Sequence, residues 1–525
     1  MNFRKMKTVR PVFFLCFIFL AKNIFASPFD MILTGDPVLE DLRFLSLESG
    51  RPFLSFTPPL SPAEIEHFLD DIDSSRFSGP AQEAYLRIRE RLTPRARLSF
   101  TSDIFSAFLD IHSTVEARAR FNEDIDWHPR HPHIAPMFSF PARFFFADIF
   151  QLYFEPFVAV IVPHYESAGR FGTNMHYDVD GELDPTFPHR VFAAAGGPWW
   201  NFQIGRDRLF WGTGHTGSLS FSQGSRYFEY ARLSFFSGQI KYSLLISQMP
   251  LRIDAMHGSA YEPSYEYFFR TTQRYFYLHR LDFMLGNTLS VGIMEGRMTG
   301  NSPLNFRYIV PSVLSTANRE SLSSSFFSLE ANWNIFRSFS VYGQFVMNDF
   351  AADSSPNGLG FMAGLNLARS FNSWGAVFFL EYIHTQPYLY MTSSPFSSFI
   401  HMNRTTAAGT GVQYHFIGFP RDTSALTLGA RFFRGSVFSF EGELSWLSRG
   451  ENAARDVVWS WSGSSAASSG VPEHNFIAAL SAQWRPLLHI AFGGNITGIL
   501  SHNNENNSGS HKAGGQVSFS VTFHY

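Results

Sequence analysis

From about residue 95 to the end of the chain, apolar and polar residues alternate with a period of two. This period places successive side chains on opposite faces of an extended chain, so it predicts β-strands rather than helices. One row is rich in Phe, Leu, Val and Trp, whereas the opposite row has Ser, Asn, Gln, Gly and Arg. Such faces are typical of strands that separate lipid from a polar lumen.

The positions of turns can be predicted from the requirement that the apolar residues of neighbouring strands lie on the same face of the sheet. The row of residues 283–293 does so only if residues 286–288 form a three-residue loop that pairs Leu285 with Leu289. The same spacing predicts a turn at Phe336-Arg337-Ser338. Further alternating segments are 97–111, 142–162, 200–211, 228–248, 359–385, 406–417, 425–448, 475–499 and 514–525.

These segments predict an all-β transmembrane barrel with antiparallel strands over residues 95–525. About 430 residues, at roughly 24 for a strand and its connection, give about 18 strands, an even number in the range of bacterial barrels. The last segment alternates as far as Tyr525 and resembles the terminal strand by which outer-membrane barrels are recognised for assembly. The alternative is a soluble β-solenoid or a set of sandwiches, but its outer face should be polar and its core richer in Val and Ile than in Phe.

Composition excludes several other classes of protein. Of 525 residues, 17% are aromatic and only 16% are charged, and 45% are hydrophobic, which excludes intrinsic disorder. Beyond the first few dozen residues there is no uninterrupted apolar stretch long enough for a membrane helix, so a helical membrane protein is disfavoured. A formal net charge of −3 gives no reason to expect a nucleic-acid partner.

Residues 1–26 have the pattern of a secretory signal peptide. Basic residues between Arg4 and Arg10 precede an apolar run, 12–20, and Ile24-Phe25-Ala26 is a plausible cleavage site. The single cysteine, Cys16, lies in this segment, so we expect no disulfide and no cysteine-bound metal in the exported chain. Export together with a barrel predicts the bacterial outer membrane as the location.

Residues 27–94 have helical periodicity and predict a small helical region. A first helix follows Asp36-Pro37. Ser61-Pro62-Ala63-Glu64 has Ser at the N-cap, Pro at N1 and Glu at N3, the pattern of a capping box. A third helix opens at Gly79-Pro80 and ends at Thr93-Pro94. Because short helices bury little surface alone, we expect them to pack on the barrel as a plug.

Three polar stretches are expected to be long extracellular loops, namely residues 164–199, 450–474 and 501–511. The acidic residues between Asp178 and Asp184 lack EF-hand spacing, so a solvated loop is favoured over a loose calcium site. The three histidines between His128 and His133 are separated by prolines, which disfavours a closed zinc site. We therefore predict no metal site.

Residues 212–217, Gly-Thr-Gly-His-Thr-Gly, match the glycine pattern of dinucleotide-binding sites. Such a site needs a helix that begins at the glycines, but residues 219–222 alternate like a strand, so a tight turn or constriction is favoured over a cofactor. There is no Gly-x-Ser-x-Gly motif and no thiol beyond the signal. We expect no cofactor and no catalytic residues, although a barrel enzyme with its residues on separate strands is an open alternative.

Arginine dominates the basic residues: only five of the 41 are lysine, and only Lys241 and Lys512 lie beyond the signal. The planar guanidinium suits paired carboxylates and aromatic faces, so it fits a lumen with Arg–Asp/Glu pairs or a site for acidic sugars. Of these two interpretations, structural lumen pairs are favoured. Charged candidates within strands are Arg206, Asp207, Arg208, Arg280, Asp282, Glu295, Arg297 and Asp349.

Residues 202–222 contain Gly205-Arg206, then Trp211-Gly212-Thr213-Gly214 and then Gly217-Ser218-Leu219. This order resembles the Wzi family of capsule-assembly outer-membrane proteins, most strongly over about residues 200–400. This chain departs from the family pattern at two places: Thr213 stands where proline is common, and Asn348-Asp349 where two acids are common. Other similar segments are His279-Arg280-Leu281, Gly292-Ile293-Met294-Glu295, Tyr308-Ile309-Val310-Pro311, Tyr342-Gly343-Gln344-Phe345, Glu381-Tyr382 and Pro387-Tyr388.

The resemblance implies an 18-stranded barrel with an N-terminal helical bundle, residues 27–94, at its periplasmic end. It also implies an outer-membrane lectin that binds capsular polysaccharide and helps to organise its attachment at the cell surface. The expected partners are the lipid bilayer, surface polysaccharide and the machinery that assembles barrels. A plugged channel for small or amphipathic solutes is the alternative function. The family-motif residues, structural or ligand-facing, are Gly205, Arg206, Trp211, Gly212, Gly214, Gly217, Glu295, Pro311, Asp349, Glu381 and Tyr382. Candidates for contact with polysaccharide are Arg206, Arg208, Trp211, Arg280 and Arg297.

Overall fold

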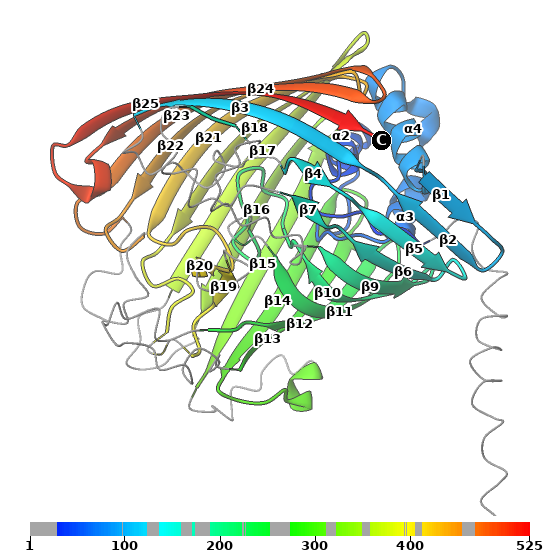
Figure 1. The fold of residues 1–525 in the computed structure, drawn as a ribbon. Helices are drawn as coiled ribbons and strands as arrows, with labels where there is room; N and C mark the ends of the chain where they lie inside the picture. Colours follow the sequence, from blue (N-terminus) through cyan, green and yellow to red (C-terminus); the bar gives the residue numbers. More distant parts are fainter. Residues whose placement is uncertain are drawn as a thin grey trace, which may run out of the picture.

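In the computed structural model, strands form one large antiparallel sheet that curves into a barrel, and helices lie at one of its ends (Figure 1). The structure describes residues 29–96, 98–122, 136–158, 171–173, 190–222, 225, 227–251, 273–310, 322–348, 358–392, 394, 396–404, 412–453 and 468–525. The signal peptide expected at residues 1–26 lies outside this set. Within it, no helix is long and apolar enough to cross a membrane.

Three α-helices precede the sheet: α2 (Val38–Ser49), α3 (Pro62–Asp71) and α4 (Pro80–Arg91), with the 3-10 helix η1 (Ser74–Arg76) before α4. The capping box of α3 is confirmed. The Glu64 N–H donates to the Ser61 hydroxyl at 3.4 Å, and the Ser61 N–H donates to Glu64 Oε1 at 3.1 Å. Helix α4 starts after Gly79 with Pro80 in its first turn, also as expected.

The strands are β1 (Leu98–Thr101), β2 (Phe105–Leu109), β3 (His112–Phe121), β4 (Phe138–Ser139), β5 (Ala142–Phe146), β6 (Phe150–Phe154), β7 (Phe157–Val158), β8 (Phe171–Thr173), β9 (Val191–Gly196), β10 (Trp200–Asp207), β11 (Phe228–Phe236), β12 (Ile240–Gln248), β13 (Arg274–Leu285), β14 (Leu289–Gly300), β15 (Ser323–Phe336), β16 (Phe339–Asn348), β17 (Gly358–Phe371), β18 (Trp374–Thr385), β19 (Ile400–Arg404), β20 (Val412–Phe416), β21 (Thr423–Arg434), β22 (Phe438–Arg449), β23 (Glu473–Leu487), β24 (Ile490–His502) and β25 (His511–His524). Two 3-10 helices, η4 (Phe306–Ile309) and η5 (Asn504–Asn506), lie in connections.

From β9 to β18 each strand pairs with the next, and the ladder then continues from β18 to β21 and on to β25. β25 pairs with β3, so the last strand lies beside the first long one (Figure 1). The described residues form 23 strands in this sheet, more than the 18 or so expected. One reason is that Phe140-Pro141 separates β4 from β5 and Glu155-Pro156 separates β6 from β7, since proline has no N–H for the ladder. The number of membrane-crossing strands therefore stays a prediction.

Local register confirms one predicted turn and corrects another. Leu285 pairs with Leu289, so residues 286–288 are the expected loop. Phe336 pairs with Phe339, so the second turn is Arg337-Ser338 alone, and a register shift near Ile335 accounts for the difference.

Two segment assignments were also wrong. Within 164–199, expected to be a loop, Val191–Gly196 forms β9. Within 406–417, expected to be part of the wall, β20 pairs only with β19 in a separate two-stranded sheet. Neither stretch has a local signal that distinguishes wall from loop, because both depend on which distant strand is available for pairing.

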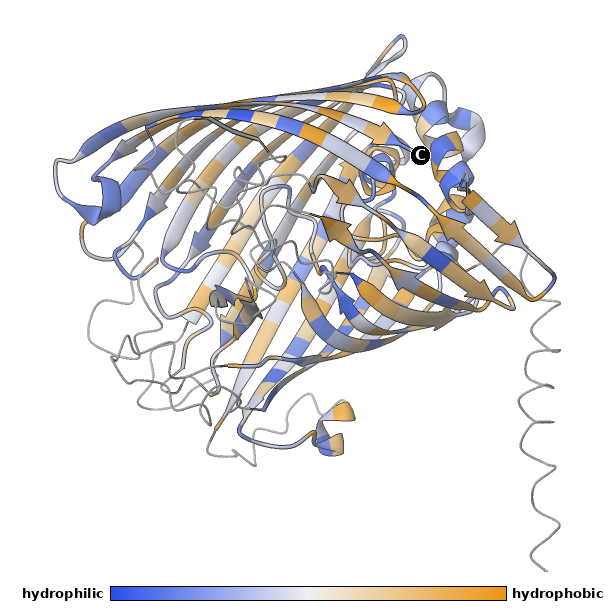
Figure 2. Ribbon diagram, viewed as in Figure 1, coloured by the Kyte–Doolittle hydropathy of each residue, from blue (hydrophilic) through white to orange (hydrophobic). Residues whose placement is uncertain are grey.

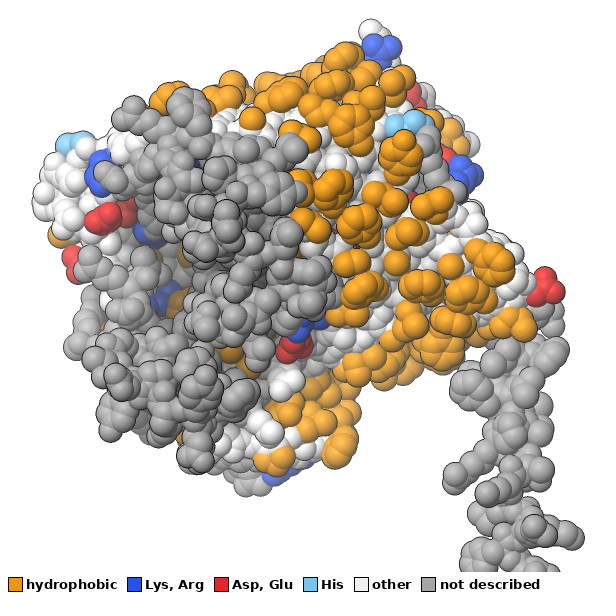
Figure 3. Space-filling model, viewed as in Figure 1, with side chains coloured by type: hydrophobic (Ala, Val, Ile, Leu, Met, Phe, Trp, Pro, Cys, Tyr) orange, Lys and Arg blue, Asp and Glu red, His pale blue; other side chains and the backbone are white. Residues whose placement is uncertain are grey.

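The outward rows of the wall are apolar. Leu281, Ile293 and Leu329 occupy one level of three neighbouring strands and are 42%, 37% and 41% exposed. Hydropathy alternates along the strands in Figure 2, and hydrophobic side chains cover the face between the two ends in Figure 3. An apolar belt of this kind is the surface that a barrel presents to lipid.

Short turns and helices share one end of the barrel. The helices surround a hydrophobic cluster that includes Leu42, Leu45, Ile65 and Ile88 and that also packs against Ala368 and Phe433 of the wall. The connection between β24 and β25, residues 503–510, lies at the opposite end (Figure 1). Short turns of such barrels face the periplasm, so the periplasmic location of the helices stays a prediction.

The lumen is only partly polar, which corrects the expectation of a polar interior. A second hydrophobic cluster, around Trp211, Phe221, Phe276 and Phe326, lies inside the barrel against β11–β18. It forms because segments between strands fold inward and bring their own apolar side chains with them. That side of the lumen is therefore a packed core.

Candidate functional site

After β10 the chain turns into the lumen. The strand ends at Asp207, earlier than the expected 211, and nearly every residue from Leu209 to Ser222 is buried. Trp211 N–H donates to Phe221 O at 3.1 Å, which is an isolated bridge rather than part of the wall. The alternation at residues 219–222 therefore does not mark a wall strand. We call residues 208–222 the inward segment.

A buried carboxylate of the wall holds this segment. Glu381 of β18 accepts hydrogen bonds from the His215 N–H at 2.8 Å and the Thr216 N–H at 2.9 Å. The Thr216 hydroxyl donates to the same carboxylate, as does the Tyr342 hydroxyl at 2.7 Å. Four donors on one carboxylate position the turn at 215–216 against the wall.

One further wall side chain and one residue of the connection after β18 anchor the next residues. Gln344 of β16 accepts from the Leu219 N–H at 2.7 Å and donates to the Ser220 hydroxyl at 2.8 Å. Tyr390 donates to Leu219 O at 2.8 Å. The Tyr342-Gly343-Gln344 and Glu381 landmarks of the sequence thus act on the glycine motif itself.

The glycines of the motif permit close packing. A side chain at Gly214 would collide with Gly217 O, and a side chain at Gly217 would come within 2.5 Å of the Phe419 ring. Gly205, in β10, has φ +140° and lies against Val191 and Phe192 of β9. Gly212 is also at positive φ, +148°. These contacts give the motif a structural role, as a turn and constriction.

The structure does not bring the five candidate polysaccharide residues together. Trp211 is 0% exposed and packs edge-on against Phe221. Arg280 is buried between Asp282, at 2.7 Å, and Glu330, at 3.2 Å. The sugar contacts of Trp211 and Arg280 stay predictions, and the two carboxylate partners of Arg280 are structural pairs inside the lumen.

The other three candidates lie on the wall or beside it. Arg206 is paired with Glu229 and lies 4.4 Å over the Tyr227 ring. Arg208 is exposed just after β10. Arg297 lies on the outward row of β14 and 5.2 Å over the Tyr308 ring. Their sugar contacts stay predictions.

Of the remaining motif residues, Glu295 and Tyr382 lie on outward rows of β14 and β18. Asp207 is buried and pairs with Arg190 at 3.0 Å. Pro311 and Asp349 lie outside the described residues.

Wall side chains also anchor the helical region. Lys241 of β12 pairs with Glu64 and donates to the Thr57 hydroxyl at 2.9 Å. Arg232 of β11 donates to Thr57 O at 3.0 Å and to Pro59 O. Arginines in this lumen thus bind backbone carbonyls as well as carboxylates, which sequence reasoning missed because a carbonyl acceptor leaves no residue-type signal.

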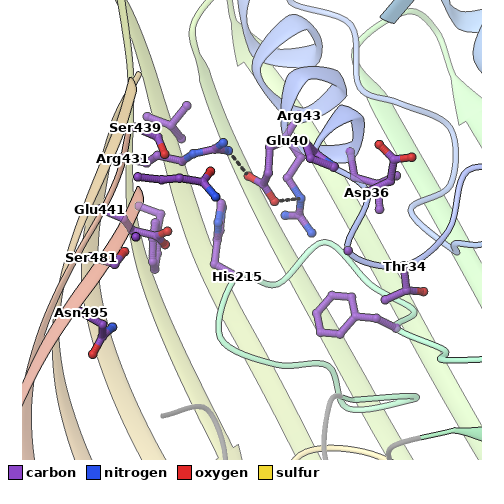
Figure 4. A pocket seen from close by; sticks show the side chains of 18 of the residues that line it. Thr34, Asp36, Glu40, Arg43, His215, Arg431, Ser439, Glu441, Ser481 and Asn495 are labelled. Carbon is purple, nitrogen blue, oxygen red and sulfur yellow. Dashed lines mark hydrogen bonds and ion pairs between the residues drawn. The ribbon is translucent and has the colours of Figure 1, made fainter. Parts of the chain in front are cut away.

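A cavity of about 570 Å³ lies between the helical region, the inward segment and the wall (Figure 4). The helical region contributes Asp36, Glu40 and Arg43 to its lining, and the inward segment contributes His215. The wall contributes inward-facing residues of β18 and β21–β25. This cavity is the candidate binding site of the described part of the chain.

Charges in the cavity are paired. Arg431 of β21 binds Glu40 at 3.0 Å, and Arg43 is 3.8 Å from the same carboxylate (Figure 4). Burial inside the barrel opposes ionisation of Glu40, but the charges of Arg431 and Arg43 outweigh it, so the pKa of Glu40 lies below its ordinary value. Burial lowers the pKa of His215, and the charge of Arg43 lowers it further, so this imidazole is neutral near pH 7.

Sequence reasoning missed the cavity residues Glu40, Arg43 and Arg431. Glu40 and Arg43 have helical i, i+3 spacing, which usually marks a solvated helix face. Their partner Arg431 is 391 residues away from Glu40, so no local pattern relates the two. Among the described residues, no group of three or more His, Cys, Asp or Glu residues could hold a metal ion.

The apolar belt, the ladder from β3 to β25 and the inward packing define an integral β-barrel protein of the bacterial outer membrane. The family model of the capsule assembly protein Wzi matches residues 141–432, which is more than half of the chain. The chain therefore belongs to the Wzi family.

The comparison with one solved structure supports the fold. Escherichia coli Wzi, an outer-membrane protein involved in group 1 capsule assembly and described as a carbohydrate-binding β-barrel, has a TM-score of 0.58 and 13% identity, with 93% of this chain and 98% of that chain covered. Pseudomonas aeruginosa OccK3 has a TM-score of 0.43 and 10% identity, with 80% and 95% covered. Curated proteins give no match.

Proposed function

We propose that this barrel binds a surface polysaccharide, capsular or exopolysaccharide, and helps to organise or attach it at the cell surface. The observation that supports it most is membership of the Wzi family over residues 141–432, together with a fold shared along nearly the whole chain with a carbohydrate-binding barrel. Binding needs no chemistry, so we propose a protein without catalytic residues. We also propose that residues 1–26 are removed on export and that the C-terminal strand is recognised by the assembly machinery.

Calorimetry of the folded barrel with polysaccharide extracted from its own cell envelope tests this function. We expect saturable binding, and none to an unrelated barrel of similar size. A protein that shows no saturable heat with any polysaccharide fraction of its envelope would contradict the proposal.

A shortened hairpin locates the binding face. His502 pairs with His511, so residues 503–510 can be replaced by Asn-Gly, which suits a two-residue hairpin turn. Loss of binding in this variant would assign the extracellular end. Retained binding would direct attention to the lumen or to residues 450–474.

A channel is the second candidate function, because a cavity of about 570 Å³ lies beside the helical region. Conductance across a planar bilayer distinguishes the two functions. We expect no steady current, since the helical region and the inward hydrophobic cluster occupy the lumen. A steady current through the full chain would favour the channel.

A further inference from the structure

Small or polar side chains line the barrel wall beside the cavity and leave it unfilled. Inward positions of β22–β25 that border it have small or polar side chains, including Ser439, Ser481, Gly493, Asn495, Ser518 and Ser520. The opposite side of the lumen is a packed apolar cluster. A void lined by apolar groups would stay dry, but small polar side chains leave room for water or for a polar ligand.

Aromatic side chains also border the cavity, although they are largely buried, and Arg43 lies 4.9 Å over the Phe56 ring. Phe56, Phe210 and Phe379 border it from the helical region, the inward segment and β18. The His215 ring stacks on Phe379 at 4.2 Å with an angle of 5° between the planes, and its Nε2 lies 2.7 Å from Asn366 Oδ1. Sugars are amphipathic, with apolar C–H faces and polar hydroxyl rims, so this mixture of surfaces suits a sugar ring better than a purely apolar molecule.

The paired charges that line the cavity favour a neutral ligand over an acidic one. Arg431 and Arg43 face Glu40, and Arg91 of α4 binds Asp36 at 2.8 Å. Each of these two carboxylates already has an arginine partner, and Glu441 adds a further negative charge to the lining. A uronate or phosphate would compete with these carboxylates for the arginines, whereas hydroxyl groups can share them.

Solvent reaches the cavity near the helical end. Gln483 and Glu441, which are both exposed, border it and lie a few residues from the short turns at 488–489 and 435–437. Its volume of about 570 Å³ is within the range of small-molecule sites, about 300–1,000 Å³.

We propose that this cavity binds a short, neutral saccharide between α2, the inward segment and the wall of β22–β25. The inference rests on the proposed function and assigns it a site and a sugar class: an uncharged stretch or end of a glycan, held inside the barrel and away from the extracellular loops.

The test fills the cavity without touching the loops. Ser481→Trp on β23 and Ser518→Phe on β25 project bulk into it, and Ala478→Trp places similar bulk on the exposed, outward row of β23 as a matched control. The probes are di- to tetrasaccharides released by partial acid hydrolysis from the envelope polysaccharide, separated into neutral and acidic fractions. A change in electrophoretic mobility on heating in detergent verifies that each variant is folded. Calorimetry measures binding.

We expect the neutral fraction to bind the unmodified barrel and Ala478→Trp equally, and both cavity-filling variants at least about tenfold more weakly. Equal binding by all folded variants would overturn the site, as would intact polysaccharide that binds while the neutral fragments do not. Binding of the acidic fraction alone would overturn the sugar class. If neither polysaccharide nor fragments bind the unmodified barrel, the proposed function itself fails, which is a separate result.

Discussion

At the scale of single residues, buried polar side chains of the wall determine where inward chain segments lie. Glu381 and Gln344 bind backbone groups of the inward segment, and Arg274 of β13 donates to Phe396 O at 2.9 Å and Ile400 O at 3.3 Å, and also to Ser398 O. Each such group is costly to bury alone and is stabilising only with its partner in place. Replacement of such a residue by a different polar residue should therefore still destabilise the barrel, because the new side chain does not match the same partners.

Replacement of Glu381 by Gln tests whether this carboxylate anchors the inward segment. The amide keeps one acceptor oxygen but presents an NH₂ group to donors, so we expect a loss of about 2–3 kcal/mol in the free energy of unfolding. Tyr342→Phe, which removes one of the four donors, should cost about 1 kcal/mol. Urea unfolding of the barrel in lipid vesicles, followed by tryptophan fluorescence, measures both. A Glu381→Gln barrel as stable as the original would contradict the anchoring role.

At the scale of elements, the helical region is a plug because the wall binds it by side chains as well as by packing. Arg232 and Lys241 reach it from β11 and β12, respectively, and Arg431 reaches it from β21. Ala368 and Phe433 pack beneath α2 and α4. Charge pairs set the position, while the hydrophobic cluster supplies the larger area. The plug and barrel should therefore separate only when several of these contacts are lost together.

Lys241→Met isolates one contact between plug and wall. It leaves the Glu64 carboxylate buried without its cation, which should cost about 3–5 kcal/mol, whereas Lys241→Met combined with Glu64→Gln should cost less than the sum of the single changes. Unfolding free energies and the rate of proteolysis within residues 51–60 report the effect, and strictly additive losses would show that the pair is not coupled.

Acid should loosen the plug through Glu40. Its pKa is lowered in the folded protein, so the stability it contributes is present above its ordinary pKa, about 4.3, and is lost as the pH falls through the folded value. We expect pepsin to cleave the plug faster as the pH falls below about 4.3, with a smaller change in Glu40→Gln. Parallel rate profiles for the two proteins between pH 5 and pH 3 would rule out this contribution.

At the scale of the whole molecule, the pairing of β25 with β3 places two strands from opposite parts of the chain side by side in the wall. The register runs from Gly515 opposite Phe121 to His524 opposite His112. This contact leaves neither strand with an open edge there, which matters because exposed edges pair with other chains.

Two introduced cysteines test the pairing of β3 with β25. Val115 lies opposite Val521, and the only native cysteine is in the segment expected to be removed, so Val115→Cys with Val521→Cys should form one disulfide on oxidation. Val115→Cys with Val517→Cys, about 13 Å apart along the strands, should not. Electrophoresis after heating measures the bond, since a bridged barrel migrates differently from an open chain. No bond at the first pair would show that the strands are not adjacent.

Local patterns in the sequence were sufficient for the period-two strands, the loop at 286–288, the capping box at Ser61 and the three helices, because each depends on neighbours within a few residues. The family resemblance added the class of protein and its location. Residues 208–222 show the limit of such patterns. They have the alternation of a strand, yet they fold into the lumen because Gln344 and Glu381, more than a hundred residues away, bind their backbone.

The chain by itself therefore determined which segments are extended, which face of each meets lipid and where the plug helices begin, since backbone geometry and hydrophobic period are short-range properties. Only the tertiary structure decided which polar residues are buried as anchors, that Trp211 and Arg280 are buried, and where Glu40 and Arg431 enclose a cavity. The physical reason is that burial and ion pairing depend on the side chain opposite, and in a barrel that partner comes from a distant part of the sequence.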